Sequence, residues 1–194
     1  MLILNIHGYH GSPQNAAYAA LQANGCDAII SPAIDYDAET PEQILATLRG
    51  IIDEQNVGLI VGTSLGGFFA AVLSAETHLP VMLVNPCLMP FLHLPRLGFK
   101  GDIKPFIPLF GTLAKLDRDN VSCIVGDADE IISTHDFTEK LLHNARFRRI
   151  PGGHHSGATL PLPEFFGEML HYYTVTLPRK ELGECVPGNL FDEE

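Results

Sequence analysis

The chain has 194 residues, of which 46% are hydrophobic and 18% charged, and its formal net charge is −11. This composition is typical of one soluble globular domain spanning 1–194 and argues against a disordered chain. The acidic balance argues against nucleic acid and against an anionic membrane surface as partners, because phosphate-rich partners bind clustered lysine and arginine.

The N-terminal residues lack the basic region and the cleavage site of a secretory signal. The four cysteines are widely spaced and form no Cys-x-x-Cys pattern. We therefore expect a cytoplasmic protein with reduced cysteines that serve mainly in packing.

Apolar runs of strand type alternate with helical segments along the chain. This alternation predicts an α/β fold with a mostly parallel sheet and helices on both faces. A helix over 13–24 is expected to start with Ser12 as its cap and Pro13 in its first turn, and another starts at Thr40-Pro41. The remaining elements are strands at 2–6, 27–30, 57–61, 80–84, 121–125 and 147–150, and helices after Ser64, at 136–144 and at 163–173.

The segment from Val57 to Ala71 combines an apolar strand, a Gly-x-Ser-x-Gly pattern at 62–66 and a helical segment rich in Ala and Phe. A strand that passes directly into a helix at such a serine is typical of a nucleophile elbow, which holds the Ser64 hydroxyl clear of the sheet. Because the pattern also occurs by chance, its interpretation depends on whether an acid and a histidine follow in that order.

Two backbone amides are candidates for binding an oxyanion beside Ser64. The Leu65 amide would lie at the N-terminus of the helix that follows the serine. The first strand leads into His7-Gly8-Tyr9, where hydrolases with this elbow place their second amide, here that of Tyr9. The alternative is an ordinary loop between strand and helix, and both interpretations can hold together.

An acid and a histidine do follow, each after one of the last two expected strands. Gly126-Asp127-Ala128-Asp129-Glu130 follows the first, and Gly152-Gly153-His154-His155 follows the second. The carboxyl ends of parallel strands meet at one edge of a sheet, where ligand sites occur. A serine needs a base within hydrogen-bond reach, a histidine can supply it near neutral pH, and a carboxylate orients the imidazole. The sequence thus predicts a serine, acid and histidine triad.

These segments, together with 7–13 and 62–67, resemble those of the YqiA-type esterases (UPF0227-like), which are compact α/β-hydrolases of bacterial cytoplasm. The resemblance runs from residue 1 to about residue 173. It implies hydrolysis of small-molecule carboxylic esters or acyl thioesters. The triad chemistry needs no cofactor.

The family patterns also select residues within the two motifs. The superfamily pattern Gly-x-x-Asp-x-x-aliphatic selects Asp129, with Ile132 in the aliphatic place, and leaves Asp127 as the alternative. The pattern Gly-Gly-x-His selects His155 and leaves His154 in the variable place.

Residues 87–116 interrupt the alternation of strand and helix with a segment rich in Pro, Phe and Leu. Long connections often carry function, so we expect a cap over Ser64 in which Phe91, Phe106 and Phe110, together with His7, line the substrate pocket. The alternative is a helical hairpin that completes the core. Residues 176–194 show no periodicity, and a surface arm, a homodimer contact and a loose tail stay open for them.

Three rival interpretations remain at the level of sequence. An acyltransferase or a peptidase would use the same triad, and a binding protein with a hydrolase fold would hold a ligand without turnover. A metal site built from the loop histidines is not expected, because their spacing matches no ligand pattern.

Overall fold

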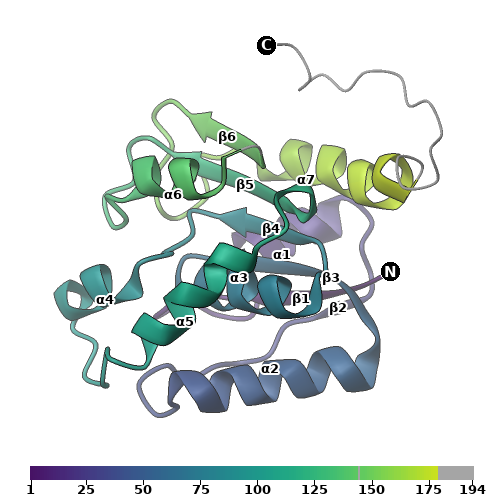
Figure 1. Ribbon diagram of the computed structural model, residues 1–194. Coiled ribbons are helices and arrows are strands. Elements are labelled where there is room, and N and C mark those ends of the chain that lie inside the picture. The colour runs from purple at the N-terminus through teal and green to yellow at the C-terminus, as the bar shows by residue number, and fades with distance from the viewer. Residues whose placement is uncertain (144, 179–194) are drawn as a thin grey trace.

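The computed structural model describes residues 1–143 and 145–178, which form a parallel sheet of six strands with helices on both faces (Figure 1). The strand order is β2-β1-β3-β4-β5-β6, and every neighbouring pair is parallel. This confirms the predicted fold class. The strands are β1 (Leu2–Ile6), β2 (Ile29–Ile30), β3 (Val57–Thr63), β4 (Val81–Val84), β5 (Val121–Gly126) and β6 (Arg146–Ile150).

Both faces of the central strands are buried, which explains their continuous apolar sequences. On β3, Ile60 packs on one face while Leu59 and Val61 pack on the other. Helices α2, α3 and α5 cover the first face, and α1 and α7 cover the second. The helices are α1 (Ala16–Ala23), α2 (Pro41–Gln55), α3 (Leu65–Thr77), α4 (Pro90–His93), α5 (Phe106–Thr112), α6 (His135–Leu141) and α7 (Leu162–His171). Short 3₁₀ turns lie at Leu94–Leu97, Leu113–Lys115 and Arg118–Asn120, and a π-helical turn at Tyr172–Thr176.

The start of α1 differs from the expectation that Ser12 caps it. Asn15 is the cap, and its Oδ1 accepts a hydrogen bond from the Tyr18 amide at 2.9 Å. The carbonyl oxygen of Pro13 is instead bound by the Ser31 hydroxyl at 2.7 Å and by the Asn5 amide group at 3.2 Å. These tertiary bonds hold Pro13 outside the helix, so the helix begins three residues later.

Other boundaries shift by a few residues. The second strand begins at Ile29, and α6 ends at Leu141. The expected helical residue Asn144 lies outside the described residues, as does 179–194 of the C-terminal segment. The predicted cap at Thr40 is confirmed, because its Oγ1 accepts from the Gln43 amide while the Gln43 side chain accepts from the Thr40 amide.

The inserted segment 87–116 folds into α4, α5 and two of the 3₁₀ turns. Phe106 on α5 is buried against Phe68 and Phe69 of α3, with ring centroids 5.7 and 6.1 Å apart. Phe91 and Phe110 are half-buried and meet edge to face at 5.5 Å. One part of the segment therefore completes the core, and a role of these phenylalanines in substrate binding stays a prediction.

Asn85, directly after β4, ties together the loops that follow β5 and β6. Its side chain is fully buried, and its Nδ2 donates to the carbonyl oxygens of His154 (3.0 Å) and His155 (3.2 Å). Its Oδ1 accepts from the Gly126 amide at 2.8 Å. The first residue after β4 thus fixes two loops that come from distant parts of the sequence.

The turn from β3 into α3 has no room for side chains on its glycines. A Cβ on Gly66 would clash with the carbonyl oxygens of Ile6 and His7, which belong to backbone that cannot move aside alone. By contrast, a Cβ on Gly50, in the middle of α2, would have no atom within 4 Å.

We therefore expect Gly66→Ala to lower the free energy of unfolding by about 2 kcal/mol or more. Gly50→Ala is the matched control and should raise it by about 0.5–1 kcal/mol, because alanine loses less entropy than glycine in a helix. Urea unfolding followed by circular dichroism measures both. Equal effects of the two substitutions would contradict the close crossing at Gly66.

Replacing Asn85 by alanine removes its hydrogen bonds and leaves the Gly126 amide buried without an acceptor. We expect Asn85→Ala to lower the free energy of unfolding by about 3 kcal/mol. In the control Asn120→Ala, the lost bonds join the partly exposed Asn120 side chain to the His78 carbonyl (3.0 Å) and to the exposed Asp117 carboxylate (3.4 Å). Because these groups can bind water instead, the loss should stay below about 1 kcal/mol. A loss at Asn85 no larger than that at Asn120 would show that it does not hold the loops.

Candidate active site

Ser64 occupies the junction between β3 and α3 in a backbone conformation that residues other than glycine rarely adopt. Its φ is 53° and its ψ is −121°, and such a conformation persists only when the surroundings impose it. Three backbone hydrogen bonds do so here. The Ser64 amide donates to Val84 O (3.0 Å), and its carbonyl oxygen accepts from Gly67 (2.9 Å) and Cys87 (2.9 Å).

The loop after β1 lies directly against Ser64. A Cβ on Gly8 would lie 2.8 Å from the Ser64 Cβ and 3.3 Å from its Oγ. His7 is buried; its Nε2 accepts from the Ile34 amide (3.0 Å), so its Nδ1 carries the proton and donates to Gly8 O (2.8 Å). The Tyr36 hydroxyl donates to His7 O. These contacts fix the backbone that leads to the Tyr9 amide, while the Leu65 amide belongs to the first residue of α3.

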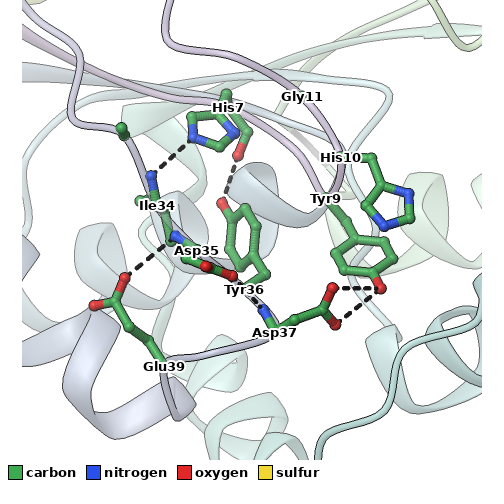
Figure 2. Close-up of a pocket in the computed structure, with 10 residues that line it drawn as sticks. His7, Tyr9, His10, Gly11, Ile34, Asp35, Tyr36, Asp37 and Glu39 are labelled. Atoms are coloured by element: carbon green, nitrogen blue, oxygen red, sulfur yellow. Dashed lines mark hydrogen bonds between the residues drawn. The ribbon is translucent and has the colours of Figure 1, made fainter.

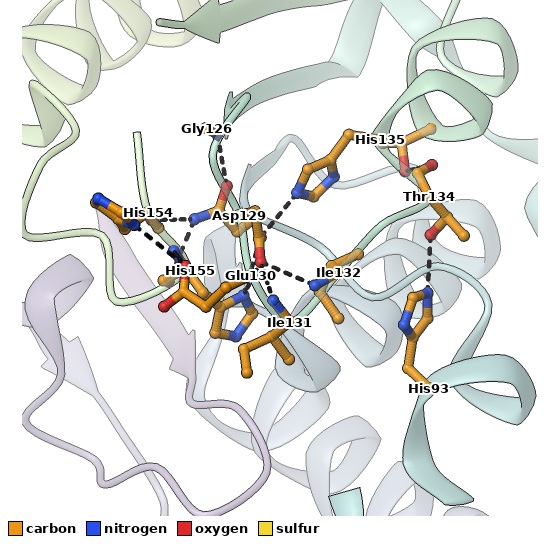
Figure 3. Close-up of polar contacts among 12 residues, drawn as sticks. His93, Gly126, Asp129, Glu130, Ile131, Ile132, Thr134, His135, His154 and His155 are labelled. Carbon is orange, nitrogen blue, oxygen red and sulfur yellow. Dashed lines mark hydrogen bonds and ion pairs between the residues drawn. The ribbon is translucent and has the colours of Figure 1, made fainter. Parts of the chain in front are cut away.

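Asp129 and His155 meet through a close hydrogen bond (Figure 3). The Nδ1 of His155 lies 3.0 Å from Oδ1 and 2.9 Å from Oδ2 of Asp129. The carboxylate is 1% exposed and the imidazole 19% exposed. Because Nδ1 faces the acid, the Nε2 of His155 is left to face a substrate or a nucleophile.

The two alternative residues lie elsewhere. His154 is about half exposed, and its Nδ1 is 3.3 Å from Glu130 at the surface. Asp127 is exposed and accepts a hydrogen bond from the Gly152 amide, which closes the turn after β6. The structure therefore brings Asp129 together with His155, and pairs neither of them with Asp127 or His154.

The carboxyl group of Asp129 stays ionised despite its burial. Burial by itself raises its pKa, but hydrogen bonds from His135, His155 and the Ile132 amide outweigh that effect and hold the pKa well below its usual value. A carboxyl with a depressed pKa stabilises the fold above the ordinary carboxyl range, and this contribution is lost as the pH falls through the depressed value. Asp129 is therefore a carboxylate throughout the neutral range.

Cys87 is buried and interacts with both Ser64 and Asp129, but its thiol is not suited to nucleophilic attack. Burial, reinforced by the negative charge of Asp129, raises the pKa of Cys87 to about 12. The reactive form of cysteine is the thiolate, so the residue acts here through its amide, which holds the Ser64 carbonyl.

Within the described residues, no hydrogen bond joins the Ser64 hydroxyl to His155. The two residues are linked through the end of β4. The Ser64 amide donates to the Val84 carbonyl, and Asn85, which follows Val84, donates to the His155 carbonyl. Bonds of this kind are often long in the absence of substrate and tighten on binding.

A cavity of about 430 Å³, lined by both polar and apolar groups, lies beside the loop after β1. Figure 2 shows His7, Tyr9 and His10 on one side of it and the 33–39 segment on the other. The segment contributes Asp35, Asp37 and Glu39, and the Tyr9 hydroxyl donates to Asp37 at 3.0 and 3.2 Å. The sequence patterns assign this segment to no helix or strand, and they select none of its acidic residues.

Residues 1–143 and 145–178 contain no group of three or more histidine, cysteine or acidic side chains that could hold a metal ion. None of the helices in the same residues has the length and apolar character to cross a membrane.

Sequence reasoning missed Asn85 and His135, whose roles depend on which loops meet in space.

Three solved structures resemble this one in their folds. Est1E from Butyrivibrio proteoclasticus is 19% identical, with a TM-score of 0.62 over 87% of this chain and 88% of that one. A candidate hydrolase of the alpha/beta superfamily from Xanthomonas campestris pv. campestris is 19% identical, with a TM-score of 0.64 over 87% and 96%. An alpha-beta serine hydrolase homologue from Coxiella burnetii is 15% identical, with a TM-score of 0.58 over 87% and 85%. These similarities show an α/β-hydrolase fold.

A family model also matches the sequence itself. It covers residues 2–101, which carry the loop after β1, the elbow at Ser64 and the start of the inserted segment. The matched part is thus more than half of the chain, as the resemblance of the sequence motifs predicts. The chain belongs to UPF0227, an uncharacterised protein family.

Proposed function

We propose that the protein is a serine hydrolase that cleaves carboxylic esters or thioesters through an acyl-enzyme on Ser64. The observation that carries the proposal is the hydrogen bond from the His155 Nδ1 to the buried, ionised Asp129. This pair lies at the carboxyl ends of the strands, as does the turn that holds Ser64. In a serine hydrolase triad, the histidine takes the proton of the serine and the carboxylate orients the histidine.

In the proposed reaction, Ser64 Oγ attacks the carbonyl carbon of the substrate while its proton passes to Nε2 of His155. The Tyr9 and Leu65 amides bind the oxygen that becomes negative. When the tetrahedral intermediate collapses, the alcohol or thiol leaves with the proton from His155. A water molecule, deprotonated by the same ring, then releases the acid and restores Ser64.

The ring orientation of His155 supports its assignment as the base. Because its Nδ1 donates to Asp129, the proton it receives from Ser64 must go to Nε2, and the buried carboxylate then stabilises the imidazolium. His154 is paired only with an exposed glutamate, which gives no comparable stabilisation.

The proposed substrate is a small molecule. The cavity beside Tyr9 adjoins the loop that contacts Ser64, and the inserted segment carries the half-buried phenylalanines. We propose that the cavity receives the leaving group and that the inserted segment, through Phe91 and Phe110, receives the acyl group.

A fluorophosphonate probe labels a serine only when its hydroxyl is activated. We expect the wild-type protein to be labelled and Ser64→Ala to be unlabelled. Ser156→Ala, which removes the hydroxyl next to His155, is the matched control and should be labelled normally. Labelling that persists in Ser64→Ala would move the nucleophile elsewhere, and an unlabelled wild-type protein would favour the binding protein.

The two neighbouring histidines give a second test. His155→Ala should lower kcat for p-nitrophenyl ester hydrolysis by about 10³-fold or more, because the base is lost. His154→Ala removes a surface side chain and should change kcat by less than about threefold. The reverse pattern would assign the base to His154, and initial-rate measurements with both variants decide between them.

A further inference from the structure

A second histidine binds the Asp129 carboxylate from the side opposite to the substrate-facing ring. His135 is the first residue of α6, and its Nε2 lies 2.8 Å from Asp129 Oδ2 (Figure 3). Its side chain is 5% exposed. One buried carboxylate therefore has an imidazole on each side.

The two imidazoles use opposite nitrogens, which gives them different capacities. His155 binds Asp129 through Nδ1 and keeps Nε2 for a substrate. His135 binds through Nε2, and its remaining Nδ1 is buried and has no hydrogen-bond partner among the described residues. A ring in this position cannot reach a substrate, so His135 is not a second base.

The hydrogen bonds are divided unevenly between the two carboxylate oxygens. Oδ1 accepts from the Ile131 amide at 2.9 Å, from the Ile132 amide at 2.8 Å and from His155 at 3.0 Å. Oδ2 accepts from His135 and from His155. Without His135, Oδ2 would keep His155 as its one donor among the described residues, and that oxygen would lose the bond that opposes the pull of His155.

Other titratable groups surround His135 but make no contact with its ring nitrogens. His93 of α4 hydrogen-bonds Thr134 at 3.0 Å, and Asp127, Asp136 and Arg149 line a cavity of about 330 Å³ beside His135. The guanidinium of Arg149 is paired with Asp136 and Glu139. The carboxylate of Asp129 is thus the charge to which His135 is directly coupled.

We propose that His135 is a positioning residue for the reaction proposed above: it locks Asp129 against His155 and takes up part of the carboxylate's charge. The inference rests on the proposed function for its effect on turnover. Its effect on the His155 ring is independent of turnover and can be measured separately.

The test compares three variants. His135→Phe keeps an aromatic ring but removes the donor, and His135→Gln keeps an amide that can reach Oδ2. His93→Phe removes a neighbouring buried histidine that does not touch Asp129. Thermal unfolding shows which variants fold; His135→Asn, whose shorter amide cannot reach Oδ2, replaces His135→Phe if that variant does not.

Two measurements are made on each variant. The first is the pH profile of kcat and KM with a p-nitrophenyl ester. The second is an NMR titration of the His155 ring, assigned by comparison with His155→Ala. Without His135, the undivided charge of Asp129 acts on the His155 imidazolium, which therefore persists to higher pH.

For His135→Phe we expect kcat to fall about tenfold or more with KM within about twofold. The acidic limb of the kcat/KM profile and the NMR midpoint should both move up by about half a pH unit or more. His135→Gln should restore most of both properties, and His93→Phe should match the wild-type protein.

Two results would overturn the inference: an unchanged His155 midpoint in folded His135→Phe, or equal changes in the glutamine and phenylalanine variants. Failure of the proposed function looks different. In that case the wild-type protein neither hydrolyses the ester nor reacts with the fluorophosphonate probe, while the NMR midpoints still report whether His135 acts on His155.

Discussion

The buried carboxylate of Asp129 is the charge around which the loops at the carboxyl ends of β5 and β6 are arranged. A charge removed from water is costly unless donors surround it. Here the donors come from its own loop, from the start of α6 and from the loop after β6. The carboxylate is therefore stable only when all three segments are in place, so assembly of the site and folding of this edge are one event.

Strand β4 contributes no side chain to the proposed chemistry, yet it lies between the strand of the nucleophile and the strands of the acid and the histidine. The residues just after β4 form hydrogen bonds between uncharged groups with the segments that follow β3, β5 and β6. Asn85 binds the loops after β5 and β6, and the Cys87 amide binds the carbonyl of Ser64. The loops that follow β3, β5 and β6 are thus all bound to the same short stretch of chain after β4.

The features that could be predicted from sequence are those that local sterics and local hydrogen bonds decide. Glycine at 62 and 66 is required wherever a strand crosses a helix this closely, and Thr40 caps a helix through residues three positions away. The start of α1 could not be predicted, because Asn5 and Ser31 hold Pro13 from other parts of the chain. The role of Asn85 could not be predicted for the same reason, since its partners are 41 to 70 residues away.

The fixed backbone on both sides of the site limits how the serine and the histidine can come together. Ser64 is held by three backbone hydrogen bonds, and His155 is held at its carbonyl by Asn85 and at its ring by Asp129. Turning a side chain costs roughly 1 kcal/mol of rotamer energy, whereas moving either loop would break several buried bonds, each costing about as much or more. In the proposed reaction, contact between Ser64 and His155 would therefore come from rotation of the two side chains and not from movement of either loop.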